Sequence, residues 1–68
     1  MEDFTINEEF INLAQLLKAL NIAETGGEAK DIIDAGEVTV NNYPENRYRK
    51  KLYPGDIVEV SGKKINIT

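Results

Sequence analysis

The absence of cysteine and histidine from a chain of only 68 residues is the feature that most constrains the fold. Small domains often gain stability from disulfides or a structural metal, and most such sites use these two residue types. Without them the chain has no disulfide, no zinc site of the common kind and no familiar general base. The fold must therefore depend on apolar packing and on strong local signals. We expect no metal and no cofactor.

The first predicted helix follows residue 12. The side chain of Asn12 can cap a helix, and Gln15 stands where a capping-box partner belongs. Phe10 and Ile11 are expected to enter the core just before this helix. Four leucines then follow helical spacing and should line one buried face: Leu13, Leu16, Leu17 and Leu20.

The second predicted helix begins at another capping box, in which Thr25 is followed three residues later by Glu28. Gly36 is suited to end this helix in a left-handed conformation. The predicted buried stripe consists of Ala29, Ile32 and Ile33. Lys30, Asp31 and Asp34 would lie outside.

Short strands and tight turns account for the remaining residues. Alternating apolar residues predict strands at 4–6, 38–40, 57–60 and 63–67. The turns between them are expected at Asn41-Asn42, Pro54-Gly55 and Ser61-Gly62. The last strand could leave a free edge, where its lysines would discourage pairing with another chain. We predict a single α+β domain over residues 1–68, in which two helices pack on a small, twisted antiparallel sheet.

Charge is distributed unevenly along this chain, whose formal net charge is −4. Residues 1–46 hold ten acids and two bases, for −8, and residues 47–68 hold six bases and two acids, for +4. The positive residues cluster in the segment Arg47, Tyr48, Arg49, Lys50 and Lys51. Its cations could contact phosphates and Tyr48 could stack on an unpaired base. The alternative is a solvated loop that balances an acidic protein.

The start of the second helix is a further candidate for phosphate contact. A helix N-terminus presents free N–H groups, and Gly26 and Gly27 would let a ligand approach the Thr25–Gly27 backbone closely. Lys30 could reach the same phosphate, and Lys18 is a weaker candidate at the edge of the patch. The alternative is an ordinary junction between a loop and a helix. The Gly and Lys spacing of a P-loop is absent.

Other functional classes have little support in the sequence. Ser61 is the only serine and has no histidine to activate it, so we expect no enzyme. No apolar run is long enough for a membrane span and no secretory signal is visible, so we expect a cytoplasmic protein without a membrane partner. Tyr43 and Tyr53 flank the basic segment, where they could stack on bases or lie half-buried in strands.

The order of these pieces resembles the S-four-type RNA-binding domain, first described in small-subunit ribosomal protein S-four and also called the alpha-L motif. The resemblance covers about residues 12–60 and is closest to the small stand-alone proteins of the YaaA/YbcJ type. Their Glu-x-Arg-x-x-x-Lys segment is matched by Glu45, Arg47 and Lys51. The other matching runs are Thr25-Gly26-Gly27-Glu28-Ala29-Lys30, Ile32-Ile33, Gly36, Val38-Thr39-Val40-Asn41 and Gly55-Asp56-Ile57-Val58-Glu59-Val60.

This resemblance implies binding of structured RNA, either ribosomal RNA or ribosomal particles, and a role in ribosome assembly or translation. It implies no small-molecule substrate. Contact would run through the start of the second helix and the basic segment, which requires the chain after Asn46 to fold back beside Lys30. The alternative is a protein-interaction module, in which an acidic face with Asp31 and Asp34 docks onto a basic partner.

Overall fold

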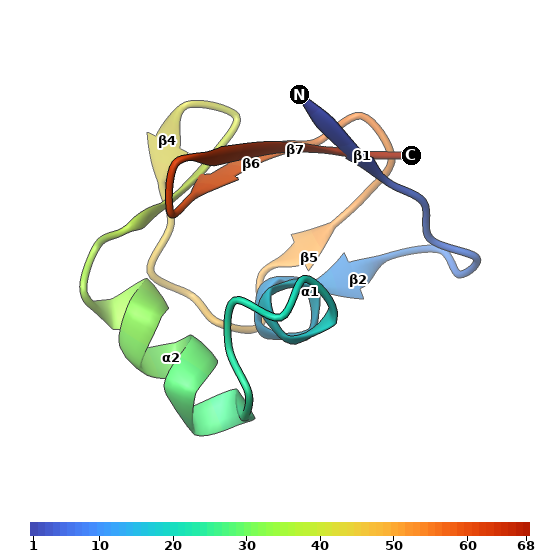
Figure 1. Cartoon of the computed structure of the whole chain (residues 1–68). Helices are drawn as coiled ribbons and strands as arrows, with labels where there is room; N and C mark the ends of the chain where they lie inside the picture. The colour runs from blue at the N-terminus through green and yellow to red at the C-terminus, as the bar shows by residue number, and fades with distance from the viewer.

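Two helices lie against one face of a five-stranded sheet in the computed structural model of the chain, which describes residues 1–68 (Figure 1). The helices are α1 (Leu13–Ala19) and α2 (Gly26–Asp34). The sheet contains β1 (Glu2–Phe4), β3 (Val38–Val40), β4 (Tyr43–Pro44), β6 (Ile57–Val60) and β7 (Lys63–Ile67). A separate two-stranded ribbon, β2 (Ile11–Asn12) and β5 (Lys51–Leu52), lies at the start of α1. The predicted α+β class is confirmed.

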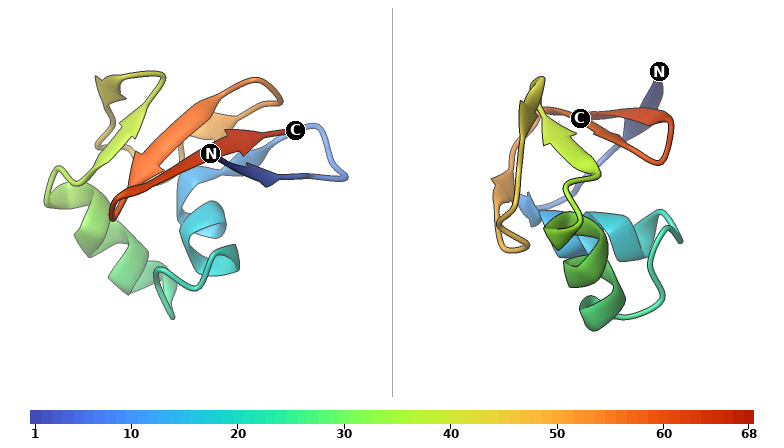
Figure 2. Two further views of the ribbon diagram at one scale, coloured as in Figure 1. Left: turned by 45° about the horizontal axis from the view of Figure 1, so that its top comes forward. Right: turned by 90° about the vertical axis from the view of Figure 1, so that its left-hand side faces the viewer.

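The sheet has the strand order β1-β7-β6-β3-β4, and the views in Figure 2 show its twist over the helices. All its pairs are antiparallel except β1 with β7, which are parallel, so the sheet is mixed rather than wholly antiparallel as predicted. β1 ends at Phe4, two residues before the predicted end of this strand. Because β1 covers the outer side of β7, the prediction of a free edge at the last strand is wrong; the edges are β1 and β4.

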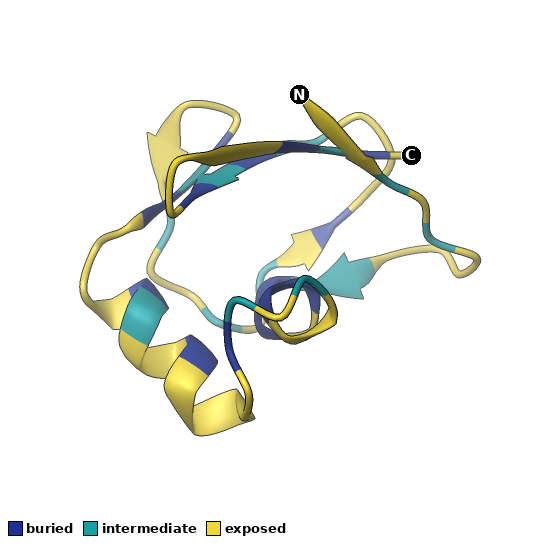
Figure 3. Cartoon of the chain, in the orientation of Figure 1, coloured by how far each residue is buried: buried dark blue, intermediate teal, exposed yellow.

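The core lies between the sheet and the helices and contains only apolar residues (Figure 3). It confirms the burial of Leu13, Leu16 and Leu17 in α1 and of Ala29 and Ile33 in α2. Leu20 and Ile32 are partly buried at its margin. Phe10 was expected in the core but is 36% exposed. It precedes β2 and packs edge-on against Tyr53, which follows β5, the partner strand of β2.

Local hydrogen bonds explain where the helices begin. In α1 the Asn12 side chain accepts from the Gln15 N–H and the Gln15 side chain accepts from the Asn12 N–H, which confirms the capping box. In α2 the Thr25 hydroxyl accepts from the Glu28 N–H at 3.1 Å. The Glu28 carboxylate, however, accepts from the N–H of Glu24 rather than that of Thr25. Neither helix has the length and hydrophobicity to cross a lipid bilayer.

The predicted turns are present and depend on residues that tolerate positive φ. Asn41 and Asn42 have φ of 52° and 72°, and Gly55 has φ of 101°. Ser61 and Gly62 connect β6 to β7 with φ of 53° and 75°. Gly36, with φ of 79°, follows α2 as expected. The turns at Asn41-Asn42 and Ser61-Gly62 join strands that pair antiparallel.

Candidate nucleic-acid interface

The basic segment, defined as Arg47–Lys51, is held across the N-terminus of α1. The Leu13 N–H donates to the Lys50 carbonyl at 2.9 Å, and the Ala14 N–H donates to the Tyr48 carbonyl at 3.0 Å. These are N–H groups that a helix start leaves without a partner inside the helix. The pairing of β5 with β2 then fixes the end of the segment. The segment backbone is therefore anchored at several points, and its charged side chains extend from that anchor.

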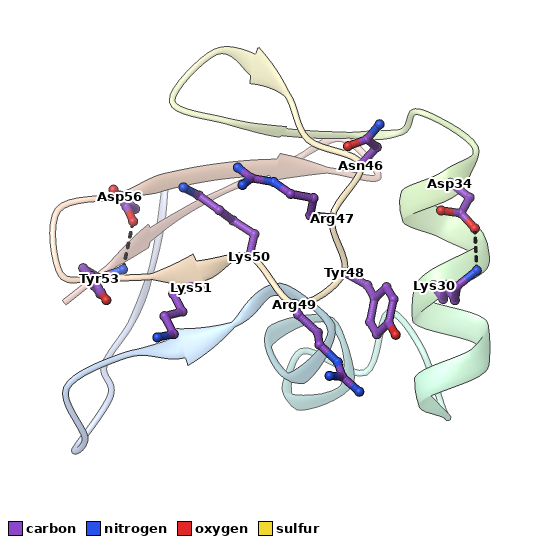
Figure 4. A pocket seen from close by; sticks show the side chains of 10 residues that line it. All are labelled: Lys30, Asp34, Asn46, Arg47, Tyr48, Arg49, Lys50, Lys51, Tyr53 and Asp56. Atoms are coloured by element: carbon purple, nitrogen blue, oxygen red, sulfur yellow. Dashed lines mark hydrogen bonds and ion pairs between the residues drawn. The ribbon is translucent and has the colours of Figure 1, made fainter.

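An open cavity of about 840 Å³, here called the basic cavity, collects the charged side chains of this segment (Figure 4). Lys30 of α2 lies on its wall, so the structure brings the second helix and the basic segment to one surface. Five of the ten lining residues are basic and two are acidic. The full lining is Lys30, Asp34, Asn46, Arg47, Tyr48, Arg49, Lys50, Lys51, Tyr53 and Asp56. The excess of positive charge makes the basic cavity a favourable binding site for a polyanion.

A second hollow of about 450 Å³ adjoins the basic cavity at Lys30, Tyr48 and Arg49. Gly26 and Gly27 lie on its wall together with Lys18, the residue predicted at the patch edge. Thr25 lines neither hollow, and its hydroxyl is occupied by the helix cap. The two hollows form a continuous surface from β5 to the start of α2, and we call this the basic surface.

Arg47 forms the closest ion pair on this surface, with Glu45. Its Nε and Nη2 donate to the two carboxylate oxygens of Glu45 at 2.9 and 3.2 Å, and its backbone N–H also donates to Glu45. These hydrogen bonds from Arg47 lower the pKa of Glu45, while the Glu45 carboxylate raises the pKa of Arg47. The pair is therefore charged at neutral pH. Nη1 of Arg47 has no partner within the protein, so one side of the guanidinium is free for a phosphate.

Lys30 also has an acidic neighbour. Its Nζ lies 3.1 Å from Oδ2 of Asp34, one turn further along α2. The hydrogen bond to Asp34 raises the pKa of Lys30, so the ammonium keeps its charge. Both side chains of the pair are about half exposed. An exposed pair of this kind contributes little to stability and exchanges readily for another anion.

Tyr48 occupies the boundary between the two hollows. It is partly buried against the core, and in Figure 4 its ring lies between the side chains of Arg49 and Lys30. Cζ of Arg49 is 5.5 Å from the ring centroid and Nζ of Lys30 is 5.9 Å from it. Both distances suit cation–π attraction, which holds the two cations beside the Tyr48 ring. Stacking of Tyr48 on an unpaired base remains a prediction.

Three cations of the basic segment have no acidic partner in the structure: Arg49, Lys50 and Lys51. Lys51 instead places its Nζ 4.9 Å from the ring centroid of Phe10. Charge that no carboxylate offsets attracts phosphate most strongly. These three side chains therefore supply most of the free positive potential of the basic surface.

The two glycines at the start of α2 are not required by the fold. Neither has positive φ, and a Cβ at Gly26 would meet nothing within 4 Å. A Cβ at Gly27 would touch only the Thr25 hydroxyl, at 3.9 Å. Their N–H groups have no acceptor within the protein. Absence of a side chain here favours close approach by a ligand, although the Glu28 carboxylate at the same helix start reduces the attraction for an anion.

Sequence reasoning did not identify the acidic and aromatic neighbours of the site. Asp34 and Asp56 line the basic cavity, and Phe10 approaches Lys51. The Asp56 carboxylate stabilises the fold, because it accepts hydrogen bonds from the Tyr53 N–H and from the Asn41 side chain. Two signals for ion pairs were available in the sequence: Glu45 and Arg47 lie two residues apart, and Lys30 and Asp34 have the i, i+4 spacing of a helical ion pair. Nothing in the sequence indicated Phe10.

Comparisons with known proteins agree with this architecture. The model of the S4 domain family matches residues 4–68. The chain is also 45% identical over 58 residues to a Bacillus subtilis (strain 168) protein named "Probable ribosome maturation protein RlbA". That match covers 85% of this chain and 82% of the relative.

Proposed function

The chain belongs to the S4 domain family, and from this membership and the basic surface we propose that it is a non-catalytic protein that binds structured ribosomal RNA. The observation that carries the proposal is the basic cavity, where Lys30 of α2 meets the four cations of the basic segment. The name of the Bacillus subtilis relative supports a role in ribosome maturation. Such a role would place the protein in the cytoplasm, with RNA or a ribosomal particle as its partner.

The distribution of acids supports an RNA ligand despite the net charge of −4. Of the twelve acidic residues, only Asp34 and Asp56 line the basic cavity. Asp56 is engaged with backbone and amide groups, and Asp34 is paired with Lys30. A phosphate can replace Asp34 as the partner of Lys30, because the pair is exposed. The remaining acids would keep the rest of the protein away from RNA and so orient its approach.

Recognition is proposed to depend mainly on the RNA backbone. Arg47, Arg49, Lys50 and Lys51 would contact neighbouring phosphates, and Lys30 with the Gly26–Gly27 backbone would contact another. Contacts of this kind read the shape and spacing of phosphates and carry little base information. The ligand class is therefore a folded RNA rather than a short sequence motif.

The alternative function is docking of a basic protein onto an acidic face with Asp31 and Asp34. Its support is weaker, because Asp34 lies on the rim of the basic cavity and pairs with Lys30. Charge reversal of both residues to lysine separates the two functions. It should preserve or strengthen RNA binding under our proposal, whereas protein docking would be abolished.

Binding to ribosomal RNA at several salt concentrations tests the proposal. Phosphate contacts from the five cations of the basic cavity should give a log–log slope of about −3.5 to −4.5, since each contributes roughly 0.7–0.9. The variant Arg47→Ala with Arg49→Ala should bind more weakly, and its slope should become shallower by about 1.4–1.8.

Lys63 and Lys64 offer a matched control for this experiment. They line a different hollow, with Glu37 and Glu59, and their double replacement by alanine removes the same charge. This control should keep the salt slope of the parent. Equal losses in both double variants would mean that only net charge matters, and the basic cavity would then have no specific role.

A further inference from the structure

Two aromatic side chains meet on the surface at the end of the basic cavity. The rings of Phe10 and Tyr53 are 5.8 Å apart between centroids, with their planes at 73°. Phe10 is 36% exposed and Tyr53 is 39% exposed. Neither ring belongs to the core or to the partly buried side chains that pack against it. The pair is therefore not explained by a need to fill the interior.

This aromatic pair is continuous with the basic surface. Tyr53 lines the basic cavity, and Figure 4 shows it at the opposite end from Lys30. The Nζ of Lys51 lies 4.9 Å from the Phe10 ring centroid, so a cation of the basic segment adjoins the pair. Phe10 also lines a hollow of about 380 Å³ that contains Lys18 and Gln15, whose Oε1 caps α1 and whose amide N–H₂ donates no hydrogen bond within the protein. The surroundings thus combine exposed rings, positive charge and an amide group.

Proteins hold unpaired bases with the same combination. An aromatic face stacks on the base while nearby cations hold its phosphates, and exposed amides can bond to its edge. A base inside a continuous duplex cannot reach such a ring without leaving its stack. An exposed aromatic pair beside a phosphate-binding site therefore favours binding of RNA that has at least one unpaired nucleotide next to a helix.

We infer that Phe10 and Tyr53 form a stacking platform for an unpaired nucleobase of the RNA whose backbone lies in the basic cavity. This inference rests on the proposed RNA-binding function and specifies the ligand further. The protein prefers a junction or bulge to an uninterrupted duplex. Lys51 contacts the phosphate of the stacked nucleotide, and Tyr53 contributes its ring to the wall of the cavity.

Two RNA hairpins that differ only by one unpaired 2-aminopurine next to the stem provide the test. Affinity for each hairpin and the fluorescence of the 2-aminopurine are measured for the parent and for Phe10→Ala with Tyr53→Ala. For the parent we expect tighter binding to the interrupted hairpin and quenched fluorescence, because the base stacks on a ring. The double variant should lose about 5- to 150-fold in affinity for that hairpin and change little on the uninterrupted one.

Control variants separate stacking from folding. Phe10→Leu with Tyr53→Leu keeps apolar contacts without rings and should show the same selective loss, with an unchanged thermal midpoint. Tyr43→Ala removes an exposed tyrosine, on β4, that lines none of the hollows described above and should have no effect.

Several outcomes would overturn the inference. The stacking platform is rejected if the parent binds both hairpins with equal affinity, or if the 2-aminopurine is not quenched. It is also rejected if the leucine variant loses affinity equally for both hairpins. Each of these outcomes leaves RNA binding itself intact. Failure of the parent to bind either hairpin or ribosomal RNA would instead reject the proposed function, and the platform with it.

Discussion

The carboxylate of Glu45 holds the guanidinium of Arg47 along one side, with Nε 2.9 Å from Oε2 and Nη2 3.2 Å from Oε1. The Glu45 side chain is only 10% exposed, and its backbone N–H donates to the Val38 carbonyl. A carboxylate fixed in this way limits the rotamers of its partner. Arg47 is thus oriented on the wall of the basic cavity before any ligand arrives, which reduces the entropy that binding must overcome.

The Glu45–Arg47 pair predicts a specific pH dependence of stability. Arg47 lowers the pKa of Glu45 below its ordinary value of 4.5, so the ionised carboxylate stabilises the fold above that pH. This contribution is lost as the pH falls through the lowered pKa of the folded state. Urea unfolding over a pH series should show that the advantage of the parent over Glu45→Gln shrinks below about pH 4.5. Arg47→Ala should remove the same pH-dependent advantage; parallel curves for all three proteins would contradict the prediction.

Replacing Asp34 with asparagine should strengthen RNA binding. The substitution removes a negative charge from the rim of the basic cavity and frees Lys30 from its ion pair. We expect a few-fold higher affinity at low salt and little change in thermal midpoint, because the pair is exposed. Asp31→Asn is the matched control, since it removes the same charge from a residue outside the cavity. An equal gain in the control would show that only net charge had changed.

Alanine at Gly26 or Gly27 should separate stability from binding. No atom stands in the way of the new methyl group at Gly26, and alanine is the better helix former. The free energy of unfolding should therefore stay constant or rise by up to about 1 kcal/mol. If RNA approaches this backbone closely, affinity should fall at the same time. Chemical denaturation and RNA titration of the same samples provide both measurements, and unchanged affinity would remove the start of α2 from the interface.

Loss of the Thr25 hydroxyl should destabilise the domain. Thr25→Ala leaves the Glu28 N–H without its acceptor and should cost about 1 kcal/mol of unfolding free energy. Thr25→Ser keeps an acceptor and should restore most of that loss. Because Thr25 lines neither hollow of the basic surface, RNA affinity of the folded variants should change little. A large loss of affinity in a folded Thr25→Ala protein would indicate direct contact with RNA.

Short-range signals predicted the helices and turns well because the groups concerned lie within a few residues of one another. The capping box of Asn12 and Gln15 closes over three residues, and the positive φ of Asn41 and Gly55 is a property of the turn itself. The α2 capping box was predicted only in part, since Glu28 bonds to Glu24. A long side chain at a helix start can reach more than one N–H, and spacing does not determine which.

The candidate site was predictable where its residues are consecutive and unpredictable where they meet across the fold. Arg47–Lys51 could be read as one cluster, and the expected start of the second helix added Gly26, Gly27 and Lys30 as candidates. The pairing of Phe10 with Tyr53 was not anticipated. The ion pair of Lys30 with Asp34 was also missed, although its i, i+4 spacing on one helix is a local signal. Phe10 and Tyr53 are more than forty residues apart in the chain, and their contact depends on the antiparallel ribbon of β2 and β5.

The sequence by itself determined the two helices, the strands at 38–40, 57–60 and 63–67, the apolar faces and the asymmetric charge, because each follows from the chemistry of neighbouring residues. It did not predict the two-residue strands β2, β4 and β5. Tertiary structure alone decided that β1 pairs in parallel with β7, that the basic segment accepts hydrogen bonds from the start of α1, and that Lys30 faces it across one cavity. These relationships join residues distant along the chain. They form only when the common core is buried, because packing of the whole domain selects among the many pairings that local preferences permit.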